Sequence, residues 1–345
     1  MSTFEQNTKK RPHVVLLGAG ASCAAIPFGD RNGKRISAMN GFIEKLGLQE
    51  IISNLPLENS SDNLEDIYME IDEKSVPGNE YEKARDELET RIYRYMSDYV
   101  IPDAPTVYDF LLLSLTSKDL VATFNWDPLL IQSYARVMRY TNNLPELAFL
   151  HGNVAVGYCE TDNVIGNVGK PCKCGEPLKA IKLLYPIKKK DYQSEIAISK
   201  SWKTLQNALA VAYMVTIFGY SAPKSDIEAI EMLKKAWGSV DNRKLEEIEI
   251  IDLRPETEVI NSWSEFIHTH HYSYHQDFFN TSLGRYPRRS CESTFDRLMN
   301  CMFLDGSKGF KKNMSFDDIQ TLIYPLLEEE IYVKTAGGML SNPYL

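Results

Sequence analysis

Five short apolar runs of this chain end in glycine or in polar side chains that could bind a ligand or take part in a reaction. Such runs are typical of buried strands in a parallel sheet, whose carboxyl ends meet at the edge where α/β proteins bind ligands. One polar residue at a strand end is more often a loop cap, whereas five such ends predict a ligand crevice. The residues at these ends are Gly18 to Ser22, Thr123 to Asp127, His151 with Gly152, Gly219-Tyr220-Ser221, and Asp252.

The turn Gly18-Ala19-Gly20-Ala21-Ser22 has the small residues that let backbone N–H groups approach a phosphate at the start of a helix. It lacks the third glycine that is usual in hydride-transferring dehydrogenases, and no strand-end acid follows about twenty residues later. Taken alone, the turn indicates either a nucleotide site or a simple tight turn.

The apolar runs alternate with helical patterns along the chain. This alternation predicts an α/β fold, a Rossmann-type parallel sheet with helices on both faces. Strands are expected at residues 14–17, 120–124, 148–150, 215–218 and 248–251, and helices between them at 128–140, 195–214 and 226–237.

Two segments interrupt this alternation and one follows it. Residues 55–104 are highly charged and contain an amphipathic helical pattern over 80–99, which predicts a helical insertion. Residues 152–185 are rich in Gly, Asn and Cys and are expected to form a small inserted module. We expect a first domain of residues 1–262 that contains both, and an aromatic and helical C-terminal extension of residues 263–345.

Composition narrows the classes of function. Of the 345 residues, 43% are hydrophobic and 25% are charged, which excludes wholesale disorder and a disulfide scaffold. With 38 Lys and Arg against 47 Asp and Glu, the net charge of −9 argues against a general nucleic-acid binder but not against a small anionic ligand. The sequence has no membrane-spanning apolar stretch and no secretory signal, so we expect a cytoplasmic protein. Its six scattered cysteines indicate reduced thiols or a metal site rather than a disulfide framework.

In their order along the chain, these motifs resemble the sirtuin (SIR2) superfamily over residues 12–255. The last motif looks most like the divergent SIR2-like domains of bacterial antiphage defence, which are typically effectors that consume NAD. The resemblance rests on residues 18–22 with Ile26-Pro27, on Thr-x-Asn-x-Asp at 123–127, on His151-Gly152, and on Gly219-Tyr220-Ser221 followed by Pro223 and Asp226.

The resemblance implies roles for individual residues in cleaving the N-glycosidic bond of NAD. Asn125 would lie near the ribose carbon that is attacked, where a neutral amide orients the nucleophile without competing with it. His151 would be the general base, because the ordinary pKa of an imidazole lies near neutrality. The residues expected to hold NAD are Gly18, Ala19, Gly20 and Ser22 at the pyrophosphate, Asp127 with Asn125 at the nicotinamide ribose, and Asp30, Arg31, Thr123, Gly219, Tyr220, Ser221 and Asp252.

The chain departs from the family pattern at the expected nicotinamide contacts. Sirtuins continue with Asp-Phe-Arg after the Ile-Pro pair, whereas this chain has Phe28-Gly29-Asp30-Arg31. Asp30 or Arg31 would therefore have to replace those contacts.

A second departure concerns zinc. Sirtuin deacylases carry a four-cysteine zinc module after the His-Gly strand, and this chain offers only Cys159, Cys172 and Cys174 there. Three thiols are one ligand short of a closed structural site, so zinc would need a water or a distant side chain as its fourth ligand. We expect a degenerate zinc-type module, with substoichiometric zinc and a fold that survives chelation.

The sequence thus predicts an NAD hydrolase (NADase) that releases nicotinamide and ADP-ribose, in the role of a bacterial antiphage effector. An NAD-dependent protein deacylase is one alternative, against which the missing fourth cysteine argues. A non-catalytic sensor of NAD or ADP-ribose is another, against which the presence of both Asn125 and His151 argues.

Partners are expected because an unregulated NADase would harm its own cell. We expect a homo-oligomer, or a complex with a separately encoded sensor or ATPase, built partly through the C-terminal extension, whose aromatic and Arg residues are types enriched at interfaces. No membrane or nucleic-acid partner is expected.

Overall fold

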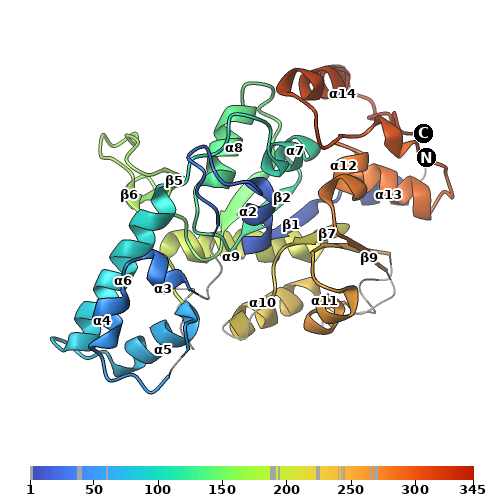
Figure 1. Ribbon diagram of the computed structural model, residues 1–345. Helices are drawn as coiled ribbons and strands as arrows, with labels where there is room; N and C mark the ends of the chain where they lie inside the picture. The colour runs from blue at the N-terminus through green and yellow to red at the C-terminus, as the bar shows by residue number, and fades with distance from the viewer. Residues whose placement is uncertain are drawn as a thin grey trace.

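A parallel sheet of six strands, in the order β3-β2-β1-β7-β8-β9, lies at the centre of the molecule (Figure 1). The five strands expected from the apolar runs are all present, and the predicted α/β fold is confirmed. The strands are β1 (His13–Leu17), β2 (Leu120–Thr123), β3 (Glu146–Phe149), β7 (Met214–Phe218), β8 (Glu247–Ile251) and β9 (Tyr272–His275). The computed structural model describes residues 3–36, 41–59, 61–186, 192, 195–222, 226–239, 241, 243, 245–264, 266–267 and 271–345.

The sixth strand, β9, lies in the segment that was expected to form a separate extension. It pairs in parallel with β8, with Tyr274 opposite Ile250. Its four residues are all half-buried and alternate Tyr with Ser and His, so it lacks the apolar run that marks the other strands. The sheet therefore continues beyond residue 262, where the first domain was expected to end.

Helices cover both faces of the sheet. Successive strand residues point to opposite faces, so Val15 and Leu17 enter one core while Val14 and Leu16 enter the other. Because both faces are buried, the strands are continuous apolar runs rather than alternating ones. The first core includes residues of α2 (Ala19–Ala25), α7 (Val107–Ser114), α8 (Leu129–Val137), α12 (Ser282–Arg285) and α14 (Phe316–Ala336), and the second those of α9 (Ile196–Val211), α10 (Ile227–Trp237) and α11 (Glu256–Ser262).

The helical insertion has a core of its own. That core includes Phe42 and Leu88 and extends to Trp126 and Tyr185, which join it to the edge of the sheet. It begins before residue 55, the start expected from the charged segment. Asn63 and Asn79 cap the two longer helices by accepting N–H groups of their first turns. The helices are α3 (Phe42–Lys45), α4 (Gln49–Ser53), α5 (Leu64–Lys74) and α6 (Glu80–Ser97).

The predicted small module forms an antiparallel sheet in the order β5-β4-β6. The inner strand β4 is buried, whereas none of the residues of β5 and β6 is. The strands are β4 (Val156–Cys159), β5 (Val164–Asn167) and β6 (Lys179–Ala180).

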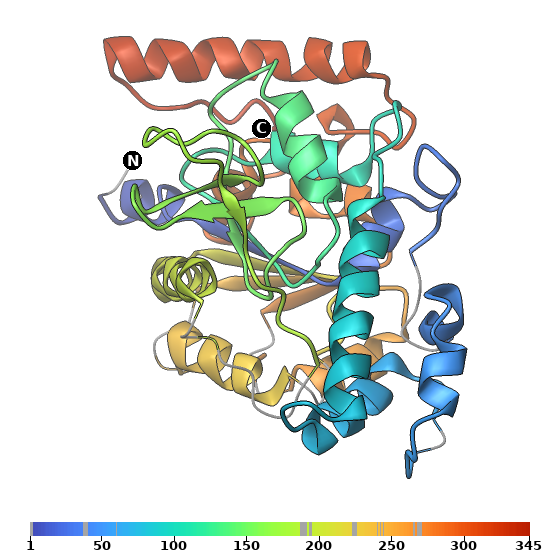
Figure 2. The ribbon, with the colours of Figure 1, turned by 90° about the vertical axis from the view of Figure 1, so that its left-hand side faces the viewer.

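The C-terminal segment returns to the sheet core and to the N-terminus. Arg288 and Arg289 are buried and pair with Glu330 and Glu329 of α14. The insertion and α14 lie at opposite ends of the molecule (Figures 1 and 2). Within the described residues, no helix combines the length and the apolarity that crossing a bilayer requires. The remaining elements are α1 (Thr3–Lys9), α13 (Ser290–Leu298) and the 3-10 helices Phe278–Asn280 and Gly306–Lys308.

Candidate functional site

A cavity of about 210 Å³ opens at the carboxyl ends of β1, β2, β3 and β7. Four strands that are far apart in the sequence meet there because they are neighbours in the sheet. The predicted crevice is therefore present at the expected edge. The described residues that line it are Gly18, Ala19, Ser22, Ile36, Glu65, Met96, Phe124, Asn125, Trp126, Asp127, His151, Leu184, Pro186, Gly219, Tyr220, Ser221 and Asp226.

The glycines of the first turn are required by contact between two backbone segments. Gly20 donates its N–H to Gly219 at 2.9 Å, and a Cβ on Gly20 would lie 2.7 Å from the Gly219 Cα. A Cβ on Gly18 would meet Gly219 and Tyr220 at 2.5 Å. Gly219 has a φ of +60°, in the left-handed region that favours glycine. The sequence assigned these glycines to phosphate approach, but close packing of the turn on the β7 end already demands them.

Asn125 is held by its amide nitrogen. The Nδ2 atom donates to the Gly18 carbonyl at 2.8 Å, to Ser22 Oγ at 2.9 Å and to Tyr108 Oη at 3.3 Å. These contacts occupy the donor end of the amide, so the carbonyl oxygen is the end that can meet a ligand. Asn125 lines the cavity and is 9% exposed, so this acceptor would act with little competition from water.

Ser22 joins Asn125 to Asp127. Its hydroxyl donates to Asp127 Oδ2 at 2.7 Å, so Tyr108, whose Oη lies 2.7 Å from Ser22 Oγ, must donate its own proton to Ser22. The second oxygen of Asp127 accepts the Leu129 N–H at 3.1 Å. Burial raises the pKa values of Asp127 and Tyr108 above their ordinary values. Both carboxylate oxygens of Asp127 accept hydrogen bonds within the protein, and the Ser22 hydroxyl belongs to this buried network.

The loop after β2 is fixed by two further side chains. Thr123 accepts the Asn125 N–H on its Oγ1 at 3.0 Å. Asn153 is buried and donates through Nδ2 to the carbonyls of Asp127 at 2.6 Å and Asn125 at 3.2 Å. Thr123 and Asn153 thus position the loop without being among the described residues that line the cavity.

His151 faces a buried carboxylate. Its Nε2 lies 3.7 Å from Asp226 Oδ1, and the two residues are 6% and 3% exposed. The other oxygen of Asp226 accepts the Tyr220 hydroxyl at 2.7 Å. Burial first, and then the Asp226 carboxylate, raise the pKa of Tyr220 well above its ordinary value, so Tyr220 remains a donor. The arrangement orients an imidazole toward a group that would stabilise its protonated form.

Aromatic rings and the helical insertion complete the walls. Phe124 stacks on Tyr220 with ring centroids 4.0 Å apart, and it packs edge to face with the His151 ring at 4.9 Å. From the insertion side, Glu65 of α5 and Met96 of α6 line the cavity. The insertion is therefore part of the site, a role that its sequence did not indicate.

Gly20 and Thr123 are next in sequence to lining residues but are not among the described residues that line the cavity, and three further predicted site residues are used elsewhere. Asp30 accepts the backbone N–H groups of Asn32, Lys34 and Val100, so its carboxylate closes a loop. Arg31 pairs with Asp103 at the surface. Asp252, at the end of β8, pairs with its neighbour Arg254 at 2.8 Å. Among the described residues, none of the three lines the cavity, and the expected replacement of nicotinamide contacts by Asp30 or Arg31 gains no support.

The site residues that sequence reasoning missed are Tyr108, Asn153, Glu65 and Asp226. Asn153 directly follows the His151-Gly152 pair. Asp226 stands five residues after Ser221, and the sequence analysis quoted it as part of the resemblance without giving it a role. Tyr108 stands in an apolar helix, where it is indistinguishable by pattern from core residues.

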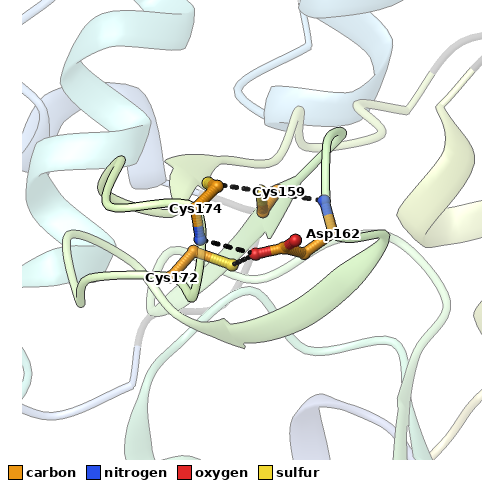
Figure 3. A group of neighbouring side chains, drawn as sticks. All are labelled: Cys159, Asp162, Cys172 and Cys174. Atoms are coloured by element: carbon orange, nitrogen blue, oxygen red, sulfur yellow. Dashed lines mark hydrogen bonds between the residues drawn. The ribbon is translucent and has the colours of Figure 1, made fainter.

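The small module brings its three cysteines together and adds a carboxylate (Figure 3). Cys159 lies at the end of β4, Asp162 in the turn that follows, and Cys172 and Cys174 in the loop before β6. Their ligand atoms all lie within 4.8 Å of one another. The sequence-based count of three candidate ligands was one short, because a single Asp in an exposed turn gives no spacing signal.

Comparisons with known proteins find remote similarity only among solved structures. No protein-family model matches the chain, and no curated protein matches it. It is similar to a "Sir2 homolog-NAD complex" at 15% identity, covering 87% of this chain and 93% of that one with a TM-score of 0.32. It is also similar to "Sir2 bound to acetylated peptide", at 14% identity, 87% and 99% coverage and a TM-score of 0.34. A third, "Structural Basis for the Mechanism and Regulation of Sir2 Enzymes", has 15% identity, 73% and 85% coverage and a TM-score of 0.37.

Proposed function

We propose that the protein is an NAD glycohydrolase that cleaves the bond between nicotinamide and ribose and releases nicotinamide and ADP-ribose. The observation that carries the proposal is the placement of Asn125 and His151 at the ends of neighbouring strands, facing one cavity. They are the two residues to which the SIR2 resemblance of the sequence assigns the reaction.

The charges of the cavity suit the nicotinamide end of NAD. Glu65, Asp127 and Asp226 line it, and no Lys or Arg is among the described lining residues. The nicotinamide ring of NAD is cationic, and positive charge moves onto the ribose as the glycosidic bond breaks. Fixed negative groups stabilise such a developing cation. By resemblance, the anionic pyrophosphate would lie at the turn Gly18 to Ser22, where backbone N–H groups begin a helix.

The reaction requires two things from the protein, a general base and a positioned water. The C1′–N bond breaks with its electron pair going to the ring nitrogen, so nicotinamide leaves neutral and needs no acid. A water oxygen bonds to C1′, and the proton it loses passes to His151. The Asn125 carbonyl accepts a hydrogen bond from that water and so directs its lone pair at C1′. Asp226 stabilises the imidazolium that forms.

The test compares turnover with binding in three variants. Asn125→Ala removes the acceptor and His151→Ala removes the base, so each should lower NAD turnover by on the order of 10² to 10⁴. NAD affinity, measured by calorimetry, should fall far less, because both variants keep the backbone N–H groups of the Gly18 to Ser22 turn; the hydrogen bond that Asn125→Ala removes ends on the Gly18 carbonyl. His271→Ala, at an exposed histidine outside the cavity, is the matched control and should keep full turnover.

Two outcomes would contradict the proposal. Binding of NAD without turnover, and without a difference between the variants, would indicate a sensor of NAD or ADP-ribose. Nicotinamide release that requires an acylated lysine peptide would indicate a protein deacylase.

The wider role follows from the resemblance and is part of the proposal. An enzyme that depletes NAD needs control, which fits a cytoplasmic antiphage effector that works as an oligomer or with a separately encoded sensor or ATPase. Support for an interface comes from apolar side chains after α13. Met299, Met302 and Phe303 are exposed there, the last by 91%. Light scattering that gives a fully active monomer would count against it.

A further inference from the structure

A cavity of about 310 Å³, separate from the candidate site, lies between α12 and the two 3-10 helices Phe278–Asn280 and Gly306–Lys308. None of the described residues that line it also lines the candidate site. Its volume is at the lower end of the range of roughly 300–1,000 Å³ that small-molecule sites occupy in proteins. The cavity is therefore large enough for a small organic molecule.

The lining of this cavity carries positive charge and no negative charge. Arg285, Lys311 and Lys312 line it, and no Asp or Glu is among the described lining residues. The whole chain, in contrast, has a net charge of −9. Among the described residues, no carboxylate lies within ion-pair distance of these three cations, whereas Arg288, three residues after Arg285, pairs with Glu330. The cavity therefore offers a place for an anion that the protein itself does not supply.

Backbone contacts between α12 and residues 306–310 place these cations. Phe310 is 1% exposed, with its ring centroid 5.1 Å from that of Phe110, and its N–H donates to the Gly284 carbonyl at 2.8 Å. The two lysines follow this buried anchor directly in the chain. A Cβ on Gly306 would lie 3.3 Å from Cδ of Arg285, so the stem of that side chain lies across the Gly306 backbone. The cations are thus attached to packed segments of the fold.

The hydrogen-bonding capacity of the cavity is that of a donor set. Within the described part of the chain, the side chains of Arg285, Lys311 and Lys312 have no hydrogen-bond partner. The carboxylate of Asp305 attracts Lys311, but it accepts the Ser307 N–H at 3.0 Å and does not line the cavity. A guanidinium binds two phosphate oxygens at once, and ammonium groups add point charges beside it. This combination fits a phosphate group.

We infer that this cavity binds the phosphate group of a small phosphate ester. Arg285 binds two phosphate oxygens, and Lys311 and Lys312 neutralise the remaining charge. Phe279 is half-buried and gives the organic part of the ester an apolar wall. An ester of about the size of a sugar phosphate or a mononucleotide fits the volume. The inference does not depend on the proposed NAD chemistry, because the two cavities share no described lining residue.

The first measurement is a calorimetric titration of the intact protein with three probes at low ionic strength, where charge interactions are least screened. Ribose 5-phosphate should bind, ribose should not, and inorganic phosphate should bind more weakly than the ester. Equal affinity for inorganic phosphate would show that the free ion is the ligand and would overturn the assignment to an ester. Absence of binding by ribose 5-phosphate would overturn the inference altogether.

Hydrogen exchange followed by mass spectrometry locates the bound ester. Ribose 5-phosphate should slow exchange in residues 278–285 and 305–312, which surround the cavity. Protection confined to residues 18–22 would place the phosphate at the candidate site alone and would contradict the inference. The two sites are thus distinguished without any measurement of NAD turnover.

Substitutions at Arg285 test the guanidinium itself. Arg285→Gln should weaken binding of ribose 5-phosphate by about tenfold or more, because two charge-assisted hydrogen bonds are lost. Arg285→Lys keeps the charge but not the paired donors, so it should also weaken binding. Arg297→Gln removes an exposed cation that does not line the cavity and is the matched control. Parent affinity in both Arg285 variants, or an equal loss in Arg297→Gln, would show that binding reflects only the general surface charge.

Discussion

Asp226 presents a buried carboxylate to the imidazole of His151. Tyr220 donates a hydrogen bond to the opposite oxygen and so fixes the carboxylate in place. A base that accepts a proton becomes a cation, and a carboxylate 3.7 Å away favours that cation. In the proposed mechanism, Asp226 is therefore a positioning residue that acts through His151.

Asp226→Asn keeps the shape of this side chain and removes its charge. The rate constant kcat should fall roughly tenfold or more with little change in KM, because the imidazolium loses its counter-charge. Without the carboxylate the protonated imidazole loses its counter-charge, so the acidic limb of the kcat profile should move to lower pH. The measurement is the pH dependence of NAD turnover.

Glu228→Gln is the control for Asp226→Asn, because Glu228 is an exposed acid in the first turn of α10, the helix that Asp226 precedes. It should leave the pH profile unchanged. An Asp226→Asn enzyme with the parent profile and the parent kcat would show that the carboxylate does not act through His151.

At the scale of elements, the turn between β1 and α2 rests directly on the end of β7. The contact is backbone on backbone, since a Cβ on Gly20 would lie 2.7 Å from the Gly219 Cα. Backbone atoms cannot rotate away as a flexible side chain does, so the helix itself would have to shift.

Gly20→Ala should therefore destabilise the fold by roughly 1–3 kcal/mol, as overpacking does, and lower the unfolding temperature. Cys23→Ala, at an exposed position of the same helix, should leave that temperature near the parent value. If Gly20→Ala keeps the parent stability but loses NAD binding, the glycine serves phosphate approach, as its sequence motif suggested, and the packing explanation is wrong.

Elements were predictable where burial leaves a simple pattern. Strands buried on both faces, such as β1 and β7, are continuous apolar runs that the sequence displays openly. β9 was missed because it is half-buried and mixes Tyr with Ser and His. The insertion was recognised as helical, but its start was placed too late because Phe42 and its neighbours precede the charged segment.

Residues of the candidate site could be predicted where they follow directly on a strand. They could not be predicted where folding brings them in from a segment far away in the sequence. Asn125, His151 and Tyr220 follow apolar runs and do line the cavity. Tyr108 reaches the same network from inside a helix, and Asp162 reaches the cysteines from an exposed turn. Asp30 was assigned by motif position, yet its carboxylate is used by three backbone N–H groups. Sequence spacing predicts which residues lie at strand ends, but it does not predict contacts between segments that are far apart in the sequence.

At the scale of the whole molecule, the residues that line the cavity come from several segments that are far apart in the sequence. The sheet edge supplies Asn125 and His151, the insertion supplies Glu65, and the segment before α10 supplies Asp226. Under the proposed function, activity therefore requires that all of these parts fold together, and a fragment that lacks one of them is not expected to turn over NAD.

The most direct test of the proposed activity is product analysis with the intact parent protein. The protein, with any partner or trigger it requires, is incubated with NAD in water labelled with heavy oxygen and without any acylated peptide. We predict equal amounts of nicotinamide and ADP-ribose, with one heavy oxygen on the ribose carbon that carried nicotinamide. Nicotinamide that appears only after an acylated lysine peptide is added, or NAD that is bound and recovered intact, would contradict the account.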